Sequence, residues 1–312
     1  MPEVRRPRAL RPGDRIAVVA PASPFRREDL DAGLAELRAL GFEPSFDERL
    51  FERRGYVAGT PELRAAMLRA AWRDPQVAGV VAVRGGYGSV QLLPLLDADE
   101  IRAARKPFVG YSDLTSLLTF ITGRAGLVAF HGPTVAGRLA GGEAAYDRAS
   151  LLAALCEPRP MGEVGGALEA LRGGEAGGPL AGGTLTQLAA SLGTPFAFDP
   201  PAGAVLLIEE VNERPYRIDR LLTQLRLAGV FGRASAVVFG ELRGCDEPGG
   251  GPTARAAVAE ALADFQGPVF AGLATGHTTG PALTLPLGVR CRVAARPGGG
   301  RLVVEEAAVD PA

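Results

Sequence analysis

Two hydrophobic patterns alternate along the first half of the chain. Short, almost continuous apolar runs of the kind that form buried strands are separated by stretches in which apolar residues recur at the i, i+3, i+4 spacing of an amphipathic helix. The predicted strands cover residues 15–23, 77–86, 106–112 and 126–133, and the predicted helices cover 27–41 and 60–74. Strands that alternate with helices are typical of an α/β protein with a largely parallel sheet.

The same alternation resumes in the second half but ends differently. Helices are predicted at 184–193, 216–229 and 253–265, and strands at 204–210, 234–242 and 267–276. Residues 282–306 predict a β-hairpin with a turn rich in Pro and Gly, so this half is mixed and not purely wound.

Residues 158–183 interrupt the alternation. They are dense in Gly and Pro with only a short apolar stretch between, which favours a domain boundary. We therefore predict an α/β fold in three parts. An amino-terminal domain with a mainly parallel wound sheet covers residues 1–157, the boundary covers 158–183, and a mixed carboxy-terminal domain that ends in the hairpin covers 184–312.

Composition limits the classes of function. The chain has 312 residues, an apolar share of 47% and a formal net charge of −1, which supply a sizeable core and give no reason to expect a nucleic-acid or membrane partner. No apolar segment precedes the first strand as a secretory signal would, and no run approaches the roughly 20 residues of a membrane span. Three widely spaced cysteines without a CxxC pair favour buried thiols, and with them a cytoplasmic location.

The stretch FVGYSDLTSLL, residues 108–118, places a serine at the corner between a strand and a helix. Leu114, Leu117 and Leu118 start the helical spacing directly after Ser112. At such a corner a hydroxyl can project above the sheet edge, and backbone N–H groups unpaired at the helix start can face what it attacks. The alternative is a helix cap, because Ser is a favoured cap and Asp113 suits the first turn of a helix.

A nucleophilic serine needs a base, and the chain has only two histidines. His131 follows an apolar run, and His277 follows the predicted strand 267–276. A base also needs a carboxylate to orient it. Glu209 and Glu210 end the buried run 204–210, at the edge of an open α/β sheet where ligands bind. Because two strand ends of one sheet can bring Glu209 and His277 together, we favour His277 as the base, whereas His131 has no acidic neighbour in sequence.

A second glycine-rich corner lies in VVAVRGGYGSVQLL, residues 80–93. Its glycines lack the spacing of dinucleotide-binding and P-loop motifs, and no acidic ribose partner or P-loop lysine accompanies them. They can instead bring a main-chain N–H toward a developing oxyanion, beside the N–H of Asp113. No cluster of His, Cys, Asp and Glu has zinc-ligand spacing, so we expect neither a metal nor a cofactor.

Several segments together resemble the L,D-carboxypeptidases of serine peptidase family S66, which also contains the microcin C self-immunity peptidases. The resemblance covers nearly the whole chain, and its segments occur in the family's order: IAVVAPAS, VRGGYGS, GYSDLT, FHGP, GGTLTQLAASLGTPF, LLIEEVNERPYRIDRLLTQL and ATGHTTGPALTLPLG. It implies a Ser-Glu-His triad with Ser112 as nucleophile, Glu209 as orienting carboxylate and His277 as general base. It also implies oxyanion donors from the N–H groups of Gly86 and Asp113, and a homodimer.

Two positions depart from the family pattern. Thr184 stands where the family often has Asn, and Glu209-Glu210 stands where it often has Glu-Asp. The second departure leaves open which glutamate faces His277. Glu213 is a third candidate, but its surroundings predict a polar turn.

The resemblance implies a small peptide substrate. The bond cleaved would join a diamino acid to a terminal D-alanine in a cytoplasmic murein tetrapeptide, through an acyl-enzyme on Ser112. Arginine is the usual partner of a terminal carboxylate, and Arg84, Arg214 and Arg217 are candidates, with Tyr87 as a further substrate contact.

Two other functions stay open at this point. A microcin-type peptidase would need an aromatic platform for adenine, and the single tryptophan, Trp72, lies on a predicted amphipathic helix where a core role is favoured. A muropeptide sensor without catalysis would have no need for a base beside a hydroxyl.

Overall fold

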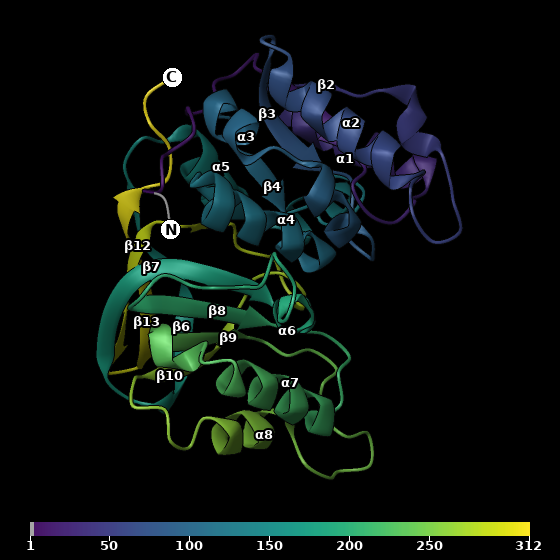
Figure 1. Ribbon diagram of the computed structural model, residues 1–312. Coiled ribbons are helices and arrows are strands. Elements are labelled where there is room, and N and C mark those ends of the chain that lie inside the picture. Colours follow the sequence, from purple (N-terminus) through teal and green to yellow (C-terminus); the bar gives the residue numbers. More distant parts are fainter. Residues whose placement is uncertain (1–2) are drawn as a thin grey trace.

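The computed structural model describes residues 3–312, which form two domains stacked one above the other (Figure 1). The first domain contains a six-stranded sheet in the order β11-β5-β4-β3-β1-β2. Its first five strands in sequence are parallel, and β11 is antiparallel to β5. The strands are β1 (Arg15–Val19), β2 (Glu43–Ser45), β3 (Val77–Ala82), β4 (Phe108–Gly110), β5 (Ala129–His131) and β11 (Leu285–Leu287). This arrangement confirms the largely parallel sheet expected for the first half.

Helices of the first domain begin and end where local sequence signals place them. In α2, the Thr60 hydroxyl accepts a hydrogen bond from the Leu63 N–H at 3.2 Å, and Pro61 occupies the first helical position, where a missing N–H costs little. Trp72 lies on the buried face of α2 and packs beside Phe108 of the sheet, in the core role that the sequence favoured. The helices are α1 (Arg27–Ala39), α2 (Pro61–Arg73), α3 (Ala98–Ala104), α4 (Thr115–Phe120) and α5 (Arg148–Cys156).

The second domain is built on a closed barrel in the order β10-β6-β13-β12-β7-β8-β9. Its strands are β6 (Pro160–Arg172), β7 (Glu175–Thr184), β8 (Ala204–Glu209), β9 (Ala234–Gly240), β10 (Val269–Leu273), β12 (Arg290–Arg296) and β13 (Gly299–Ala307). Its helices are α6 (Leu185–Ser191), α7 (Pro215–Leu227) and α8 (Ala254–Ala261). The hairpin β12–β13 confirms the predicted mixed ending.

The segment 158–183, which we expected to be a boundary, instead forms most of the two long strands β6 and β7. Two of its glycines allow backbones to pack closely. A Cβ at Gly178 would lie 1.8 Å from the Gly203 carbonyl oxygen, and one at Gly182 would lie 1.9 Å from that of Leu207. Glycine in a strand can mark such a close approach as well as a loop, and composition alone does not distinguish the two.

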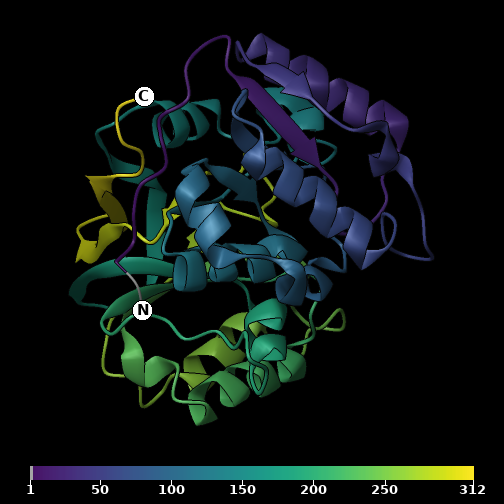
Figure 2. The ribbon, with the colours of Figure 1, turned by 45° about the horizontal axis from the view of Figure 1, so that its top comes forward.

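The C-terminal part of the chain also returns to the first domain. β11 pairs with β5, and the backbones of Ala9 and Pro7 exchange hydrogen bonds with Asp310. Figure 2 shows the yellow C-terminal segment beside the purple N-terminal one. The first domain is therefore not continuous in sequence, a feature that a boundary drawn by residue number does not capture.

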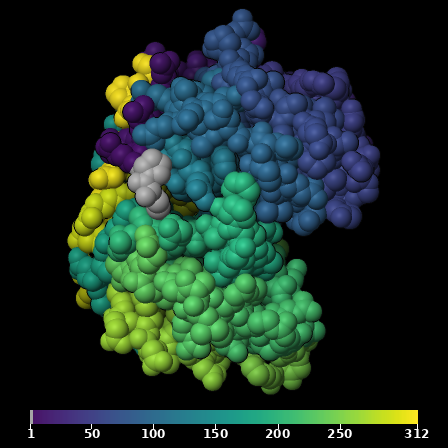
Figure 3. All heavy atoms as spheres, viewed as in Figure 1, coloured from purple at the N-terminus to yellow at the C-terminus, as the bar shows by residue number. Residues whose placement is uncertain are grey.

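The two domains meet at the ends of strands that carry the candidate residues. Ser112 follows β4 of the first sheet, whereas Glu209 ends β8 and His277 follows β10 of the barrel. Figure 3 shows the seam between the domains, with the surface hollowed at its right-hand side. No helix within residues 3–312 has the length and apolar character needed to cross a membrane.

Candidate active site

Ser112 lies at a strained corner of the backbone. Strand β4 ends at Gly110, Ser112 has a φ of 67°, and a short 3₁₀ turn over Ser112–Leu114 leads into α4. A left-handed conformation is costly for a residue with a Cβ and concentrates at functional sites. Among residues 3–312 the Ser112 hydroxyl forms no hydrogen bond, and it caps neither the 3₁₀ turn nor α4. The helix-cap alternative therefore does not describe this serine.

The glycine-rich corner after β3 packs directly against this serine. A Cβ at Gly85 would lie 2.9 Å from the Ser112 Cβ, and one at Gly86 would lie 2.4 Å from the Ser23 hydroxyl oxygen. Gly86 also has a φ of 105°. Only glycine fits at both positions, and the backbone of the corner can therefore lie within contact of the Ser112 side chain.

The side chain of Asp113 connects the two corners. Its carboxylate accepts hydrogen bonds from the N–H groups of Gly88 at 3.2 Å and Ser89 at 2.8 Å, and its carbonyl oxygen accepts one from the Ser89 hydroxyl at 2.6 Å. The residue is buried. The expected oxyanion donors, the N–H groups of Gly86 and Asp113, thus belong to two segments that one carboxylate holds together.

A buried arginine that the sequence did not point to supports the same corner. Arg64 of α2 is 1% exposed, and its guanidinium donates to the carbonyl oxygens of Pro21 at 2.6 Å and Gly88 at 2.8 Å. Burial lowers the pKa of Arg64, although the nearby Asp113 carboxylate opposes that shift. Nothing in the spacing of an amphipathic helix reveals that one of its arginines faces inward.

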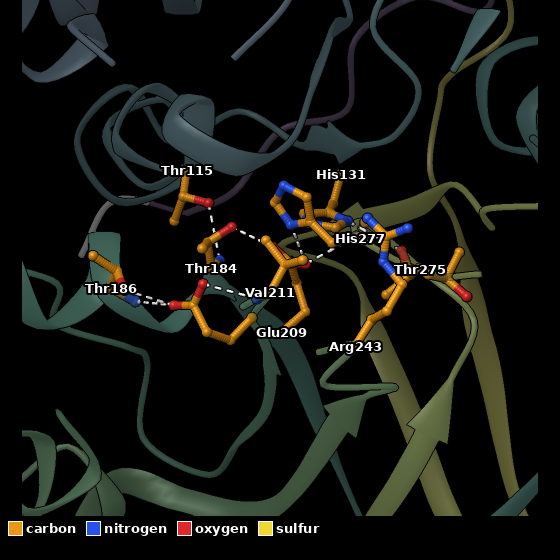
Figure 4. Close-up of polar contacts among 12 residues, drawn as sticks. Thr115, His131, Thr184, Thr186, Glu209, Val211, Arg243, Thr275 and His277 are labelled. Carbon is orange, nitrogen blue, oxygen red and sulfur yellow. Dashed lines mark hydrogen bonds and ion pairs between the residues drawn. The ribbon is translucent and has the colours of Figure 1, made fainter. Parts of the chain in front are cut away.

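Glu209 and His277 form a hydrogen-bonded pair at the facing edge of the barrel (Figure 4). The His277 Nδ1 lies 2.7 Å from the Glu209 Oε2, which also accepts the His277 backbone N–H at 3.0 Å. The other carboxylate oxygen accepts the Thr184 hydroxyl. Because the carboxylate engages Nδ1, the neutral ring carries its proton there and its Nε2 is left as the acceptor.

Electrostatics favour an ionised Glu209 beside this imidazole. Burial alone would raise the pKa of the carboxyl, but the hydrogen bond and charge of His277 outweigh it and hold the pKa below the usual value. The His277 side chain is 18% exposed, against 2% for Glu209. A Cβ at Gly276 would lie 2.6 Å from the Glu209 Oε2, so the residue before His277 has to be glycine.

The other two glutamates that we considered have different partners. Glu210 accepts the Thr186 N–H at 2.9 Å, the Thr186 hydroxyl at 2.6 Å and the Val211 N–H at 2.9 Å, so it binds the start of α6. Burial raises its pKa. Glu213 forms an ion pair with Arg217 at 3.5 Å. Only Glu209 among the three bonds to His277, which answers the question left open by the sequence.

His131 lies close to the same carboxylate although no acidic residue is near it in sequence. A Cβ at Gly276 would lie 2.6 Å from the Glu209 Oε2 and 3.0 Å from the His131 Cε1, so the carboxylate and this imidazole lie on either side of one point. His131 is fully buried, its Nδ1 lies 3.1 Å from the Thr275 hydroxyl, and its Nε2 has no partner among the described residues. Burial lowers its pKa to about 4, which keeps the ring neutral.

Tyr111, the residue before Ser112, joins the two domains at this point. Its ring meets that of His277 edge to face at a centroid distance of 5.1 Å and that of His131 at 6.1 Å. Nearby, the Thr184 N–H donates to the Thr115 hydroxyl at 3.0 Å. These contacts bring the barrel edge with Glu209 and His277 against the corner that carries Ser112.

Arg138 from the first domain holds the loop of His277. Its guanidinium donates to the carbonyl oxygens of Gly276 at 3.0 Å, Gly280 at 3.1 Å and Thr278, and to Ala145 at 3.1 Å. The loop is also held from the barrel, where Glu241 accepts the Thr279 N–H at 2.8 Å. The base candidate therefore sits on a loop fixed from both domains.

The predicted substrate contacts are less closely grouped. The Arg84 guanidinium donates to the Pro24 carbonyl at 3.3 Å, Arg214 pairs with Glu247 at 2.7 Å, and Arg217 pairs with Glu213. Tyr87 is 44% exposed. Its ring packs edge-on to that of Tyr56 at 5.4 Å.

The geometry defines a class of site. A serine lies on a strained strand-to-helix corner beside glycine-rich backbone, and the preceding residue, Tyr111, contacts an imidazole that a carboxylate orients. A serine, an imidazole and a carboxylate are the residue types that serine hydrolases use to attack a carbonyl carbon.

Comparison with known families agrees with that class. The N-terminal domain of the LD-carboxypeptidase family, Peptidase S66, matches residues 16–132, and its C-terminal domain matches residues 177–293. The chain belongs to this family and is a carboxypeptidase of the serine type.

Individual relatives cover almost the whole chain. A Streptomyces coelicolor protein described provisionally as a carboxypeptidase is 40% identical over 96% of this chain and 96% of its own length. The murein tetrapeptide carboxypeptidase of Pseudomonas aeruginosa is 32% identical, over 84% of this chain and 88% of its own. The structure of the microcin C7 self-immunity protein MccF of Escherichia coli shares the fold, with a TM-score of 0.88, 24% identity and coverage of 98% and 99%.

Proposed function

We propose that the protein is a cytoplasmic L,D-carboxypeptidase that removes the terminal D-alanine from murein tetrapeptides during peptidoglycan recycling. The observation that carries the proposal is the Glu209–His277 pair held against the Ser112 corner, in a chain whose Pseudomonas aeruginosa relative is named as a murein tetrapeptide carboxypeptidase. The family resemblance also leads us to expect a homodimer.

In the first half of the proposed reaction, His277 accepts the Ser112 proton at Nε2 as the hydroxyl oxygen attacks the carbonyl carbon of the diamino acid. The imidazolium that forms is stabilised by the ionised Glu209 carboxylate at Nδ1. The oxyanion is bound by the N–H groups of Gly86 and Asp113, which cost no reorganisation because their segments are already fixed. His277 then protonates the departing D-alanine nitrogen.

In the second half, His277 takes a proton from water as the water oxygen attacks the ester carbonyl of the acyl-enzyme. The bond to Ser112 Oγ then breaks, His277 returns the proton to Oγ, and the tripeptide leaves with a new carboxylate. Both half-reactions use one imidazole that exchanges one proton, so the site needs no further titrating group.

The test is incubation of the purified protein with murein tripeptide, tetrapeptide and pentapeptide, with released D-alanine measured by mass spectrometry. We expect release from the tetrapeptide by the wild type and none by Ser112→Ala. Binding without turnover by the wild type would instead identify a sensor. Cleavage of an aminoacyl-sulfamoyl adenylate but not of the tetrapeptide would identify a microcin-type peptidase, for which the buried Trp72 offers no exposed platform.

A further inference from the structure

A carboxypeptidase has to recognise the free carboxylate at the end of its substrate. This inference rests on the function proposed above and concerns the residue that performs this recognition. A guanidinium suits the task because its N–H groups match the two oxygens of a carboxylate. Such an arginine needs a position near the triad, donors that are not already used, and a backbone that holds it in place.

The arginines suggested by the sequence do not meet these conditions. Arg214 and Arg217 are each paired with a glutamate. Among the described residues Arg84 keeps most of its donors free, but its guanidinium donates to the Pro24 carbonyl at 3.3 Å and its charge helps to lower the pKa of Asp29, after the larger contribution of Arg26. Its side chain is therefore directed toward the segment 24–29. Arg138 is near the triad, but four backbone carbonyls occupy its guanidinium.

Arg243 lies near the triad, as the first condition requires. It follows β9 by three residues, and its backbone forms a parallel bridge with Val211, two residues after Glu209. The Asn212 N–H donates to the Arg243 carbonyl oxygen at 2.9 Å. Figure 4 shows its side chain extending from the barrel end toward the level of the two histidine rings.

The loop that carries Arg243 is locally constrained. Leu242, the residue before Arg243, has a φ of 53°, and Asn212, which donates to the Arg243 carbonyl, has a φ of 57°. Both are therefore in the left-handed region. Left-handed residues with side chains persist where the surrounding structure fixes them. The backbone of Arg243 is therefore held, while its side chain is exposed.

Its charge is also available. Within residues 3–312 Arg243 enters no ion pair, and its side chain donates no hydrogen bond to another residue. Burial raises the pKa of Tyr111, and the charges of Arg138 and Arg243 both oppose that shift. Arg243 thus acts electrostatically on the residue that precedes Ser112.

We propose that the guanidinium of Arg243 binds the terminal carboxylate of the peptide substrate and so makes the enzyme an exopeptidase. The carboxylate of the leaving residue then lies beside the barrel loop 241–243, with the scissile nitrogen facing His277. No bond changes at Arg243, which acts as a specificity-determining residue and not as a member of the triad.

The test compares a tetrapeptide that ends in D-alanine with the same peptide ending in D-alanine amide. The wild type is expected to prefer the free acid by about 100-fold in kcat/KM, the range expected for a charge-assisted contact. Arg243→Gln should lose most of that preference, chiefly through KM, while the rate on the amide stays unchanged. Arg243→Lys should keep part of the preference. Arg214→Gln is the matched control and should keep all of it.

Binding to the inactive Ser112→Ala form separates this inference from the proposed function. Calorimetry should show tight binding of the acid and weak binding of the amide, with the difference removed by adding Arg243→Gln. Wild-type turnover with an acid preference that survives Arg243→Gln would overturn the inference alone. A wild type that releases no D-alanine, and whose Ser112→Ala form does not distinguish acid from amide, would overturn both.

Discussion

The two histidines occupy neighbouring positions around one carboxylate, yet their surroundings suit them to different tasks. His277 lies on a loop fixed from both domains, keeps part of its surface exposed and bonds to Glu209 through Nδ1. His131 ends β5 in the core of the first domain, bonds to Thr275, and has its pKa lowered to about 4 by burial. We therefore expect His277 and not His131 to act as the base, because a base has to accept and release a proton in contact with substrate as well as lie near a carboxylate.

The largest effect that can test this comparison is loss of the nucleophile. Ser112→Ala should lower kcat/KM by about 10⁴-fold or more, and the double variant Ser112→Ala/His277→Asn should be hardly worse, because members of one triad act as a unit. Rates of D-alanine release measure both. Multiplicative losses would show that Ser112 and His277 act independently, contrary to the mechanism.

Removing the charge of Glu209 should have the next largest effect. Glu209→Gln keeps the shape but no longer stabilises the imidazolium, so kcat should fall by about 10²- to 10⁴-fold. Glu210→Gln is the matched control, since that carboxylate binds the start of α6, and it should leave kcat within about threefold of the wild type. Equal losses of kcat in steady-state assays of the two variants would show that Glu209 is not the carboxylate that supports His277.

A smaller effect is expected from Arg138, which positions the loop of His277. Arg138→Ala frees the carbonyls of Gly276 and Thr278 and should lower kcat by about tenfold, because a misplaced base loses part of its geometric advantage. Arg138→Lys should recover part of the rate, and KM should change little. A rise in KM with kcat unchanged would instead mean that Arg138 binds substrate.

His131 should matter least for turnover and should affect stability in a pH-dependent way. Its folded pKa of about 4 lies below the unfolded value of about 6.5, so between these values the unfolded chain binds a proton that the folded chain does not. Stability from this residue is present above pH 6.5 and is lost as the pH falls.

The size of the His131 effect can be measured by urea denaturation at pH 7.5 and pH 5. Lowering the pH should remove about 2 kcal/mol of unfolding free energy through His131, at about 1.4 kcal/mol per pH unit below the unfolded pKa. The reference is His131→Asn, which keeps a donor for Thr275 and should not show this decrease of about 2 kcal/mol in unfolding free energy. An equal fall in both proteins would contradict the neutral, buried state of His131.

Much of the architecture could be predicted from the sequence because hydrophobic period and helix caps act locally. The parallel first sheet, α2 with its Thr60 cap and the final hairpin are of this kind. The closed barrel could not be predicted, because a segment as rich in glycine as 158–183 can be either a linker or a pair of strands whose backbones pack closely. Strand β11 returns to the first sheet through a long-range pairing that no local pattern encodes.

The same distinction applies to the site. The corner at Ser112 and the strand end at Glu209 leave local signals, the expectation that strand ends meet at one sheet edge favoured pairing Glu209 with His277, and the family resemblance implied the triad with Ser112. The supporting contacts of Arg64, Arg138 and the Asp113 carboxylate join segments that are distant in the chain, so they became visible only in three dimensions. The closeness of His131 to Glu209 was missed for the same reason.

We assign the activation of Ser112 to His277 and not to His131. The most direct measurement is the rate of D-alanine release from murein tetrapeptide per folded molecule by His277→Asn and His131→Asn, with the folded fraction of each determined by circular dichroism. We expect His277→Asn to lose at least about 10⁴-fold in rate, whereas His131→Asn should stay within about threefold of the wild type. A folded His277→Asn enzyme with near-normal turnover beside a folded but inactive His131→Asn enzyme would contradict this assignment.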